Sequence, residues 1–190
     1  MTPEQTKQFI SGGQWQSIAP EIRPSGIKNA DGSLKPFYLT RKFTYYPGDK
    51  FELEIINLAD PYGKVLLAKL FIKGHMQWKG EHPIATGAYK VDFVADQEYE
   101  VTPLFQGFAD VLNQLASRDY NKWEVGRAQS IFKKSFAPFG LADGQIFSEC
   151  DLIYINNDLM FWGARNVDGR GFDKEENRPT NLQIPLMRHT

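Results

Sequence analysis

Apolar and polar side chains alternate along most of this 190-residue chain. The clearest run is FYLTRKFTYY at residues 37–46, where the odd positions are apolar and the even positions are more polar. Because successive side chains of a strand point to opposite faces, this run predicts a β-strand with one buried face. Arg41 is the exception, since it falls on the apolar side of its strand.

Similar alternation predicts eight to ten strands in mostly antiparallel order. Gly74 lies inside one long run, where a glycine is typical of a bulge or a sharp bend. We expect a loop at residues 24–36, a turn at residues 96–97 and a hairpin turn at residues 156–157. The further predicted strands are residues 13–24, 51–58, 65–79, 86–95, 98–102, 145–155, 158–165 and 181–187.

Two segments break the alternation. Residues 1–12 predict an N-terminal arm or short helix, with Thr2 as its cap and Pro3 in its first turn. At residues 103–116 the apolar side chains recur at helical spacing, with Thr102 as the expected cap, and a loop or second short helix follows. We therefore expect a single domain at residues 13–190, with a helical insertion at about residues 103–137.

Many short alternating strands separated by turns predict an all-β fold, either a closed antiparallel barrel or a sandwich. Between these two we expect a β-barrel of about eight to ten strands. A closed barrel of this size can hold one small ligand in its interior.

Composition narrows the classes of function. Aromatic residues make up 14% of the chain, which favours strands and ligand cavities. The formal net charge of -1 argues against nucleic acid as the main partner. We expect a cytoplasmic protein without a stable membrane anchor, because no leader or long apolar run is visible. A chain from which a leader had been removed would look the same, and the oligomeric state is left open.

The predicted first strand carries charged residues in phase with a tryptophan. In GQWQSIAPEIRP, at residues 13–24, Trp15, Glu21 and Arg23 share one face. Unpaired charges are expensive to bury, so this face fits a barrel that holds a mostly apolar ligand with one polar end. Arg23 and Arg41 would bind a carboxylate or phosphate head group, with Glu21 orienting them. The alternative is an internal ion pair that closes the barrel end.

Other candidates for chemistry are few. His75 would serve as a general base if a bulge at Gly74 turned it inward. The histidines and the single cysteine, Cys150, have no spacing typical of a metal site, and we expect neither a metal nor a cofactor. Aromatic side chains that would line a pocket, or else form ordinary core, are Tyr45, Trp78, Tyr89, Tyr99 and Trp162.

Gly13-Gln14-Trp15 is similar to the Gly-x-Trp signature of lipocalins and related calycin barrels. The wider pattern, GQWQSIAPEIRP, FYLTRKFTYYPGDKFELEIINLADPYG, LFIKG and ATGAYKVDFVADQEYEVTP, resembles one domain of the adenomatosis polyposis coli down-regulated family of Wnt inhibitors, over about residues 13–115. The resemblance implies a calycin-like, lipid-binding barrel. The residues inside the matching motifs are Trp15, Glu21, Arg23, Arg41 and Tyr45.

Members of that family are secreted or membrane-anchored, rich in disulfides and built from tandem domains. This chain has one cysteine, one expected domain and no visible leader or anchor. The resemblance therefore supports the fold and the class of ligand rather than a role in Wnt signalling.

Three functions remain from the sequence. The first is binding of a small hydrophobic ligand, such as a fatty acid or another lipid with an anionic head group, by Arg23, Arg41, Glu21, Tyr45, Trp15, Trp78 and Tyr89. The second is a barrel enzyme that isomerises or cyclises a small hydrophobic substrate, with His75, Tyr45, Glu21 or the arginines at its site. The third is an interaction module, which predicts a filled interior and an exposed apolar patch.

Overall fold

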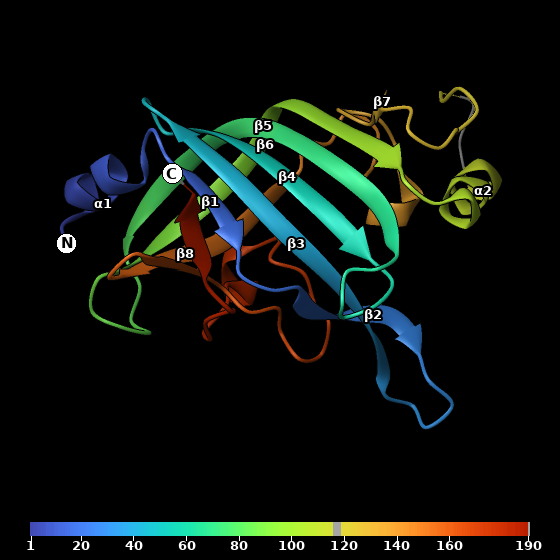
Figure 1. Ribbon diagram of the computed structural model, residues 1–190. Helices are drawn as coiled ribbons and strands as arrows, with labels where there is room; N and C mark the ends of the chain where they lie inside the picture. Colours follow the sequence, from blue (N-terminus) through green and yellow to red (C-terminus); the bar gives the residue numbers. More distant parts are fainter. Residues whose placement is uncertain (116–118, 190) are drawn as a thin grey trace.

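The computed structural model describes residues 1–115 and 119–189 of the chain (Figure 1). These residues form a mostly antiparallel β structure, which confirms the all-β prediction. The helices are α1 (Pro3–Ile10) and α2 (Gln106–Leu115), with short 3-10 turns η1 (Ala137–Phe139) and η2 (Glu175–Asn177). The strands are β1 (Gln14–Ser17), β2 (Glu21–Lys28), β3 (Leu34–Tyr46), β4 (Lys50–Leu58), β5 (Leu66–Glu81), β6 (Ala88–Pro103), β7 (Gln129–Ser130), β8 (Ser148–Asn156), β9 (Leu159–Trp162) and β10 (Leu186–His189).

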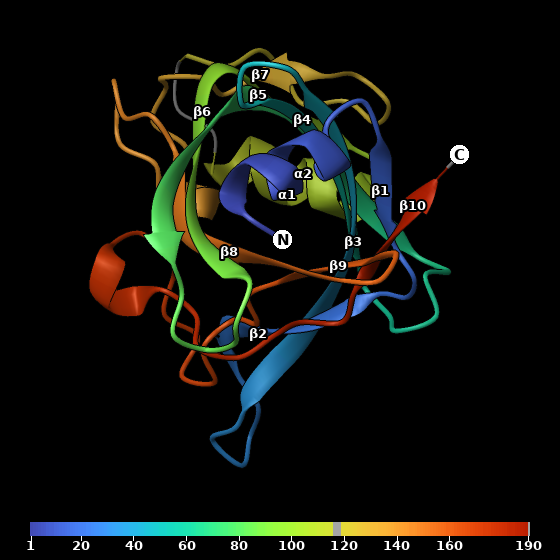
Figure 2. The same cartoon turned by 90° about the vertical axis from the view of Figure 1, so that its left-hand side faces the viewer.

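The strands pair in a ring. Their order is β1-β10-β9-β8-β6-β5-β4-β3-β2, and β1 also pairs with β3, which closes the ring. The first and last strands of the chain, β1 and β10, are neighbours in it. The ring is uneven, because β5 and β6 have 16 residues each whereas β1, β9 and β10 have four. Figures 1 and 2 place α1 across one end of this ring and α2 near the other.

The predicted first strand is divided into β1 and β2, both of which pair with β3. The division falls at residues 18–20, where Pro20 has no amide hydrogen to offer a neighbouring strand. The prediction of a loop at residues 24–36 is wrong for most of that range. Strands β2 and β3 continue into it as a hairpin that projects beyond the ring (Figure 1).

Strands β5 and β6 are longer than their sequence signals suggest. The expected turn at residues 96–97 does not exist, because β6 runs without a break through that point. The pairing of β5 with β6 is instead irregular between Lys73 and His75, where its register shifts. Gly74 lies at this shift, as predicted for a bulge. A Cβ atom at Gly74 would lie 1.8 Å from the carbonyl oxygen of Val94, so only glycine allows the two strands this approach.

The helical segments follow the prediction in part. Helix α1 begins as expected, with the Thr2 side chain accepting a hydrogen bond from the Gln5 amide and Pro3 in the first turn. Helix α2 begins at Gln106, because Thr102 is still paired with β5.

Beyond α2, residues 119–137 form a loop that contains the two-residue strand β7 rather than a second α-helix, and residues 116–118 of the predicted insertion lie outside the described residues. The loop is tied to α2 by Asn113, whose side chain hydrogen-bonds the backbone amide and carbonyl of the buried Trp123.

The end of the chain also differs from its prediction. Strand β10 is Leu186–His189 instead of residues 181–187, and Leu182 forms only an isolated bridge with Gly163. No helix in the described part of the chain has the length and the apolar character needed to cross a bilayer.

Aromatic side chains fill the middle of the ring. Trp162 stacks on Phe43 at 4.3 Å and lies 4.0 Å from Phe93, measured between ring centroids. Phe43 also stacks on Tyr45 toward the end that α1 covers. These aromatic side chains therefore fill the middle of the ring, and a cavity lies farther along it, away from α1.

We expect Gly74→Ala to lower the free energy of unfolding by about 2–3 kcal/mol, because the new methyl group would push β5 and β6 apart. Chemical denaturation measures this loss. Gly171→Ala is the matched control, since its Cβ would meet neighbours at 3.5 Å or more and should change little. Equal unfolding midpoints for the two variants would contradict the close approach at Gly74.

Candidate ligand-binding site

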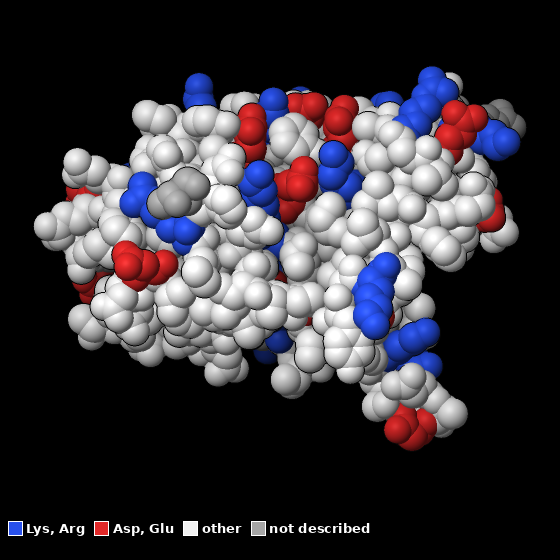
Figure 3. Space-filling model, viewed as in Figure 1, with Lys and Arg blue, Asp and Glu red and all other residues white. Residues whose placement is uncertain are grey.

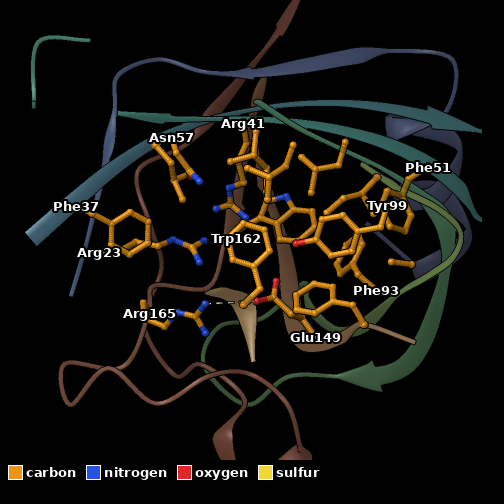
Figure 4. Close-up of a pocket in the computed structure, with 18 residues that line it drawn as sticks. Arg23, Phe37, Arg41, Phe51, Asn57, Phe93, Tyr99, Glu149, Trp162 and Arg165 are labelled. Atoms are coloured by element: carbon orange, nitrogen blue, oxygen red, sulfur yellow. Dashed lines mark ion pairs between the residues drawn. The ribbon is translucent and has the colours of Figure 1, made fainter. Parts of the chain in front are cut away.

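A cavity of about 240 Å³ lies inside the ring, beyond the aromatic cluster (Figure 4). Figure 4 shows Arg23, Asn57 and Arg165 at one side of it and Phe51, Phe93 and Tyr99 at the other. The cavity is therefore apolar with one charged end. Its lining residues are Arg23, Phe37, Leu39, Arg41, Phe51, Leu53, Ile55, Asn57, Leu70, Ile72, Phe93, Ala95, Tyr99, Phe139, Phe147, Glu149, Trp162 and Arg165.

Glu21 holds the two predicted arginines together behind the charged end. Its Oε1 atom accepts a hydrogen bond from Arg41 Nε at 2.6 Å, and its Oε2 atom lies 3.4 Å from an Nη atom of Arg23. All three side chains are buried, with exposed fractions of 0% for Glu21, 3% for Arg41 and 7% for Arg23. A carboxylate buried so deeply is stable only because it is paired.

Two donor groups of these arginines have no partner among the described residues. They are Nε of Arg23 and Nη2 of Arg41, both shielded from bulk solvent. Arg41 also lies over the ring of Trp162, with its guanidinium carbon 4.9 Å from the ring centroid. Buried donors are rarely left unpaired in proteins, so these two indicate a missing acceptor.

The arginines stay charged in this environment. Burial lowers the pKa of Arg23, and the charge of Glu21 offsets part of that effect. Burial also acts to lower the pKa of Arg41, but the charges of Glu21 and Asp151 outweigh it and the pKa is raised. Both groups therefore present permanent positive charge to the cavity.

A second ion pair completes the charged end. Arg165 lies 3.5 Å from Glu149, each side chain being 20% exposed, and its guanidinium stacks on Phe172 at 4.6 Å. The cavity is thus bordered by three guanidinium groups, while Glu21 and Glu149 supply two carboxylates. The charged end can accept one more anionic group.

Asp151 is a third carboxyl close to this end, although it does not line the cavity. Its Oδ1 atom accepts hydrogen bonds from the backbone amides of Leu152 and Gly163, at 2.7 and 2.9 Å. Its Oδ2 atom is buried without a partner in the described chain. Burial raises the pKa of Asp151 to about 7, against the opposing charge of Arg41. The group therefore changes its charge near neutral pH.

Four of the residues predicted to bind ligand lie outside the cavity, nearer α1. Trp15 donates a hydrogen bond from Nε1 to the carbonyl of Ile10, and Arg188, rather than Arg23 or Arg41, lies over its ring at 5.9 Å. The hydroxyl of Tyr45 donates to Met160 Sδ at 3.6 Å. These two side chains are fully buried parts of the core.

Trp78 and Tyr89 pack against each other edge to face, at 5.9 Å between ring centroids. Trp78 donates to Asp49, and the Tyr89 hydroxyl donates to the carbonyl of Met1. Their partners are the N-terminus and the β3–β4 turn, so these side chains hold the α1 end of the ring together.

His75 lies on the outer face of β5, although the predicted bulge is present beside it. Its Nδ1 atom is 2.9 Å from Asp96, its Nε2 atom is 3.1 Å from Gln77, and its side chain is 34% exposed. The register shift does not turn the side chain inward, because His75 still lies on the same face of β5 as Lys73 and Gln77. His75 therefore takes no part in the cavity.

The structure adds residues that the sequence did not single out. Tyr99 and Trp162 were expected as pocket aromatics, and both line the cavity. Glu149, Arg165 and Asn57 were not expected. Glu149 shares its strand face with buried residues of β8, which is the same signal of a charge in an inward phase that identified Arg41.

One further cluster lies away from the cavity. Ligand atoms of Asp92, Cys150 and Glu175 lie within 4.8 Å of one another. The Arg178 guanidinium already binds both carboxylates, at 2.5 Å and 2.6 Å, and burial raises the pKa of the Cys150 thiol to about 11. This arrangement is an ion pair that fastens the C-terminal loop to β6.

No model of a known protein family matches this chain.

We expect the contribution of Asp151 to the stability of the protein to fall as the pH rises from about 4 through 7, because its pKa is higher in the folded protein than the usual 3.8. The Asp151→Asn variant keeps an acceptor for the two amides and has no carboxyl to ionise. Its free energy of unfolding, relative to the wild type, should increase by roughly 2–3 kcal/mol between pH 5 and pH 8. Denaturant titrations at several pH values measure this, and parallel pH curves for the two proteins would rule out a buried ionising Asp151.

Proposed function

We propose that this protein binds a small hydrophobic molecule with an anionic head group inside a calycin-like barrel. The observation that carries the proposal is the pair of buried, unpartnered N–H groups on Arg23 and Arg41 beside an apolar cavity. A carboxylate or phosphate oxygen is the acceptor that such groups bind best.

The arrangement of charges supports an anion rather than a neutral ligand. Glu21 uses one edge of each guanidinium and leaves other donors free, so it holds the arginines in place without neutralising both. Ordered arginines lose little conformational freedom on binding. The aromatic faces of Phe51, Phe93 and Trp162 would cover the apolar part of the ligand.

The size of the cavity limits the ligand. A dry protein cavity of about 150 Å³ holds a benzene molecule, so 240 Å³ suits a ligand of about ten non-hydrogen atoms. A medium-chain acid would fill this volume, whereas a long-chain fatty acid would extend beyond it. Among the lipids considered from the sequence, we therefore favour the smaller ones.

Binding is favoured over the two other functions. An enzyme that uses His75 is disfavoured, because that side chain lies on the outer face of β5. An interaction module without a ligand predicts a filled interior, whereas here the ring is hollow beyond Trp162.

We expect octanoate to bind at least tenfold more tightly than octanol, because only the carboxylate can pair with the free arginine donors. Arg41→Lys keeps a positive charge beside Glu21 but has no Nη2 group. It should weaken octanoate binding about tenfold and leave octanol unchanged, as measured by isothermal titration calorimetry. Hexyl phosphate, tested in parallel, identifies the preferred head group.

Arg188→Lys is the matched control for this substitution, since Arg188 lies over Trp15 outside the cavity. It should bind octanoate like the wild type. Equal affinities for octanoate and octanol, or equal losses in the two lysine variants, would show that the arginines at the cavity do not recognise an anion.

Filling the cavity should weaken binding without changing any charge. Ala95 is a buried lining residue, so Ala95→Leu places extra carbon atoms in the space that the ligand needs. We expect at least a tenfold loss of octanoate affinity, with a smaller loss for acetate, whose short chain does not fill the cavity. If octanoate still binds with wild-type affinity, its binding site is not this cavity.

A further inference from the structure

Tyr99 gives the cavity a polar group apart from its charged end. The side chain comes from β6, is only 5% exposed and lines the cavity. Figure 4 shows it on the side opposite Arg23 and Arg165, with its ring directed toward Trp162. Phe139 and Phe147 pack against the ring, with centroid distances of 6.2 and 5.6 Å, so its orientation is fixed by apolar neighbours.

The hydroxyl of Tyr99 has no hydrogen-bond partner in the described part of the chain, although it is not one of the fully shielded polar atoms. This separates it from three other buried or partly buried tyrosines. Tyr45 donates to Met160 Sδ, and Tyr89 donates to the carbonyl of Met1. Tyr120, in the loop after α2, donates to the carbonyl of Ser135. Buried tyrosine hydroxyls usually find a partner, so the partner of Tyr99 should come from the contents of the cavity.

The Tyr99 hydroxyl remains a neutral donor in this place. Burial raises its pKa far above the ordinary value, and the nearby Glu149 charge adds to this effect. A neutral phenol surrounded by phenylalanines suits an uncharged oxygen, whereas a second anionic group would be placed among apolar side chains without a counter-charge.

From this geometry we propose that the ligand carries, besides its anionic head group, an uncharged hydroxyl or carbonyl oxygen that hydrogen-bonds Tyr99. The preferred ligands are then compact hydroxylated or oxo-substituted organic acids rather than plain alkyl acids. This inference rests on the proposed function, because the head group at Arg23 and Arg41 directs the rest of the molecule toward Tyr99.

The expected discrimination follows from the cost of an unpaired polar group. A plain acid would displace water from the cavity and leave the Tyr99 hydroxyl without a partner. A site built to bind a hydroxyl group therefore rejects an analogue that lacks it more strongly than an apolar pocket rejects a missing methylene group.

Matched aromatic acids test the inference. Phenylpropanoate and the ortho, meta and para isomers of hydroxyphenylpropanoate differ only by one hydroxyl group and fit the apolar walls. We expect at least one isomer to bind the wild type tenfold or more tightly than phenylpropanoate, measured by calorimetry. In Tyr99→Phe this preference should disappear, because the isomer loses affinity while phenylpropanoate keeps it.

Tyr45→Phe is the matched control, since Tyr45 is equally buried inside the ring but does not line the cavity. It should keep the wild-type preference. Thermal unfolding checks that the variants are folded, and Tyr99→Phe without ligand should unfold at nearly the same temperature as the wild type, because it removes no hydrogen bond within the described chain.

The outcomes separate this inference from the proposed function. If phenylpropanoate and all three isomers bind with equal affinity, or the preference survives in Tyr99→Phe, then Tyr99 does not bind a second polar group of the ligand. The proposal that the cavity binds an anion would be unaffected. If none of these acids and no medium-chain acid binds, both proposals fall together.

Discussion

The buried carboxylate of Glu21 is the constraint on which the interior of this protein depends. It is fully shielded from solvent, and its interactions with Arg41 and Arg23 are what make its charge tolerable there. The three residues come from β2 and β3, which pair directly, with Glu21 opposite Leu39 and Arg23 opposite Phe37. A shift of one residue in this pairing would turn Glu21 and Arg23 to the other face, so the ion cluster and the strand register stabilise each other.

The two ends of the ring have different roles because they are filled differently. Near α1, aromatic side chains pack against one another, and their polar atoms find partners in the N-terminus, the β3–β4 turn and Met160. Beyond Trp162, apolar and ion-paired side chains line a cavity instead of filling the space. Trp162 lies at the boundary between the two parts: it stacks on Phe43, lines the cavity and has the Arg41 guanidinium carbon 4.9 Å from its ring centroid.

The polar groups around the cavity fall into two kinds. Arg23 and Arg41 are paired in part by Glu21 and keep one free donor each, whereas the Tyr99 hydroxyl has no partner in the described chain. Asp151 is a nearby group whose charge changes around neutral pH, and it interacts electrostatically with both Arg41 and Glu149 of the cavity lining. A ligand that satisfies both kinds of group would fix its own orientation along the cavity.

The amino-acid sequence by itself determined the all-β character and most of the strands, though not all their bounds. It also determined the bulge at Gly74, the capped first helix and the inward phase of Glu21, Arg23 and Arg41, because alternation, capping and glycine geometry are local properties. Only the tertiary structure decided which inward side chains share a cavity. Trp15 and Arg41 both point inward, yet they lie in different parts of a long ring. Glu149 joins the site because β8 pairs with the distant strand β6, and Arg165, beyond the end of β9, forms an ion pair with Glu149. The alternation along a strand decides which face of the sheet a side chain lies on. How far along the ring axis that side chain lies depends on the strand register and on how the ring closes, and both are set by contacts between segments distant in the sequence.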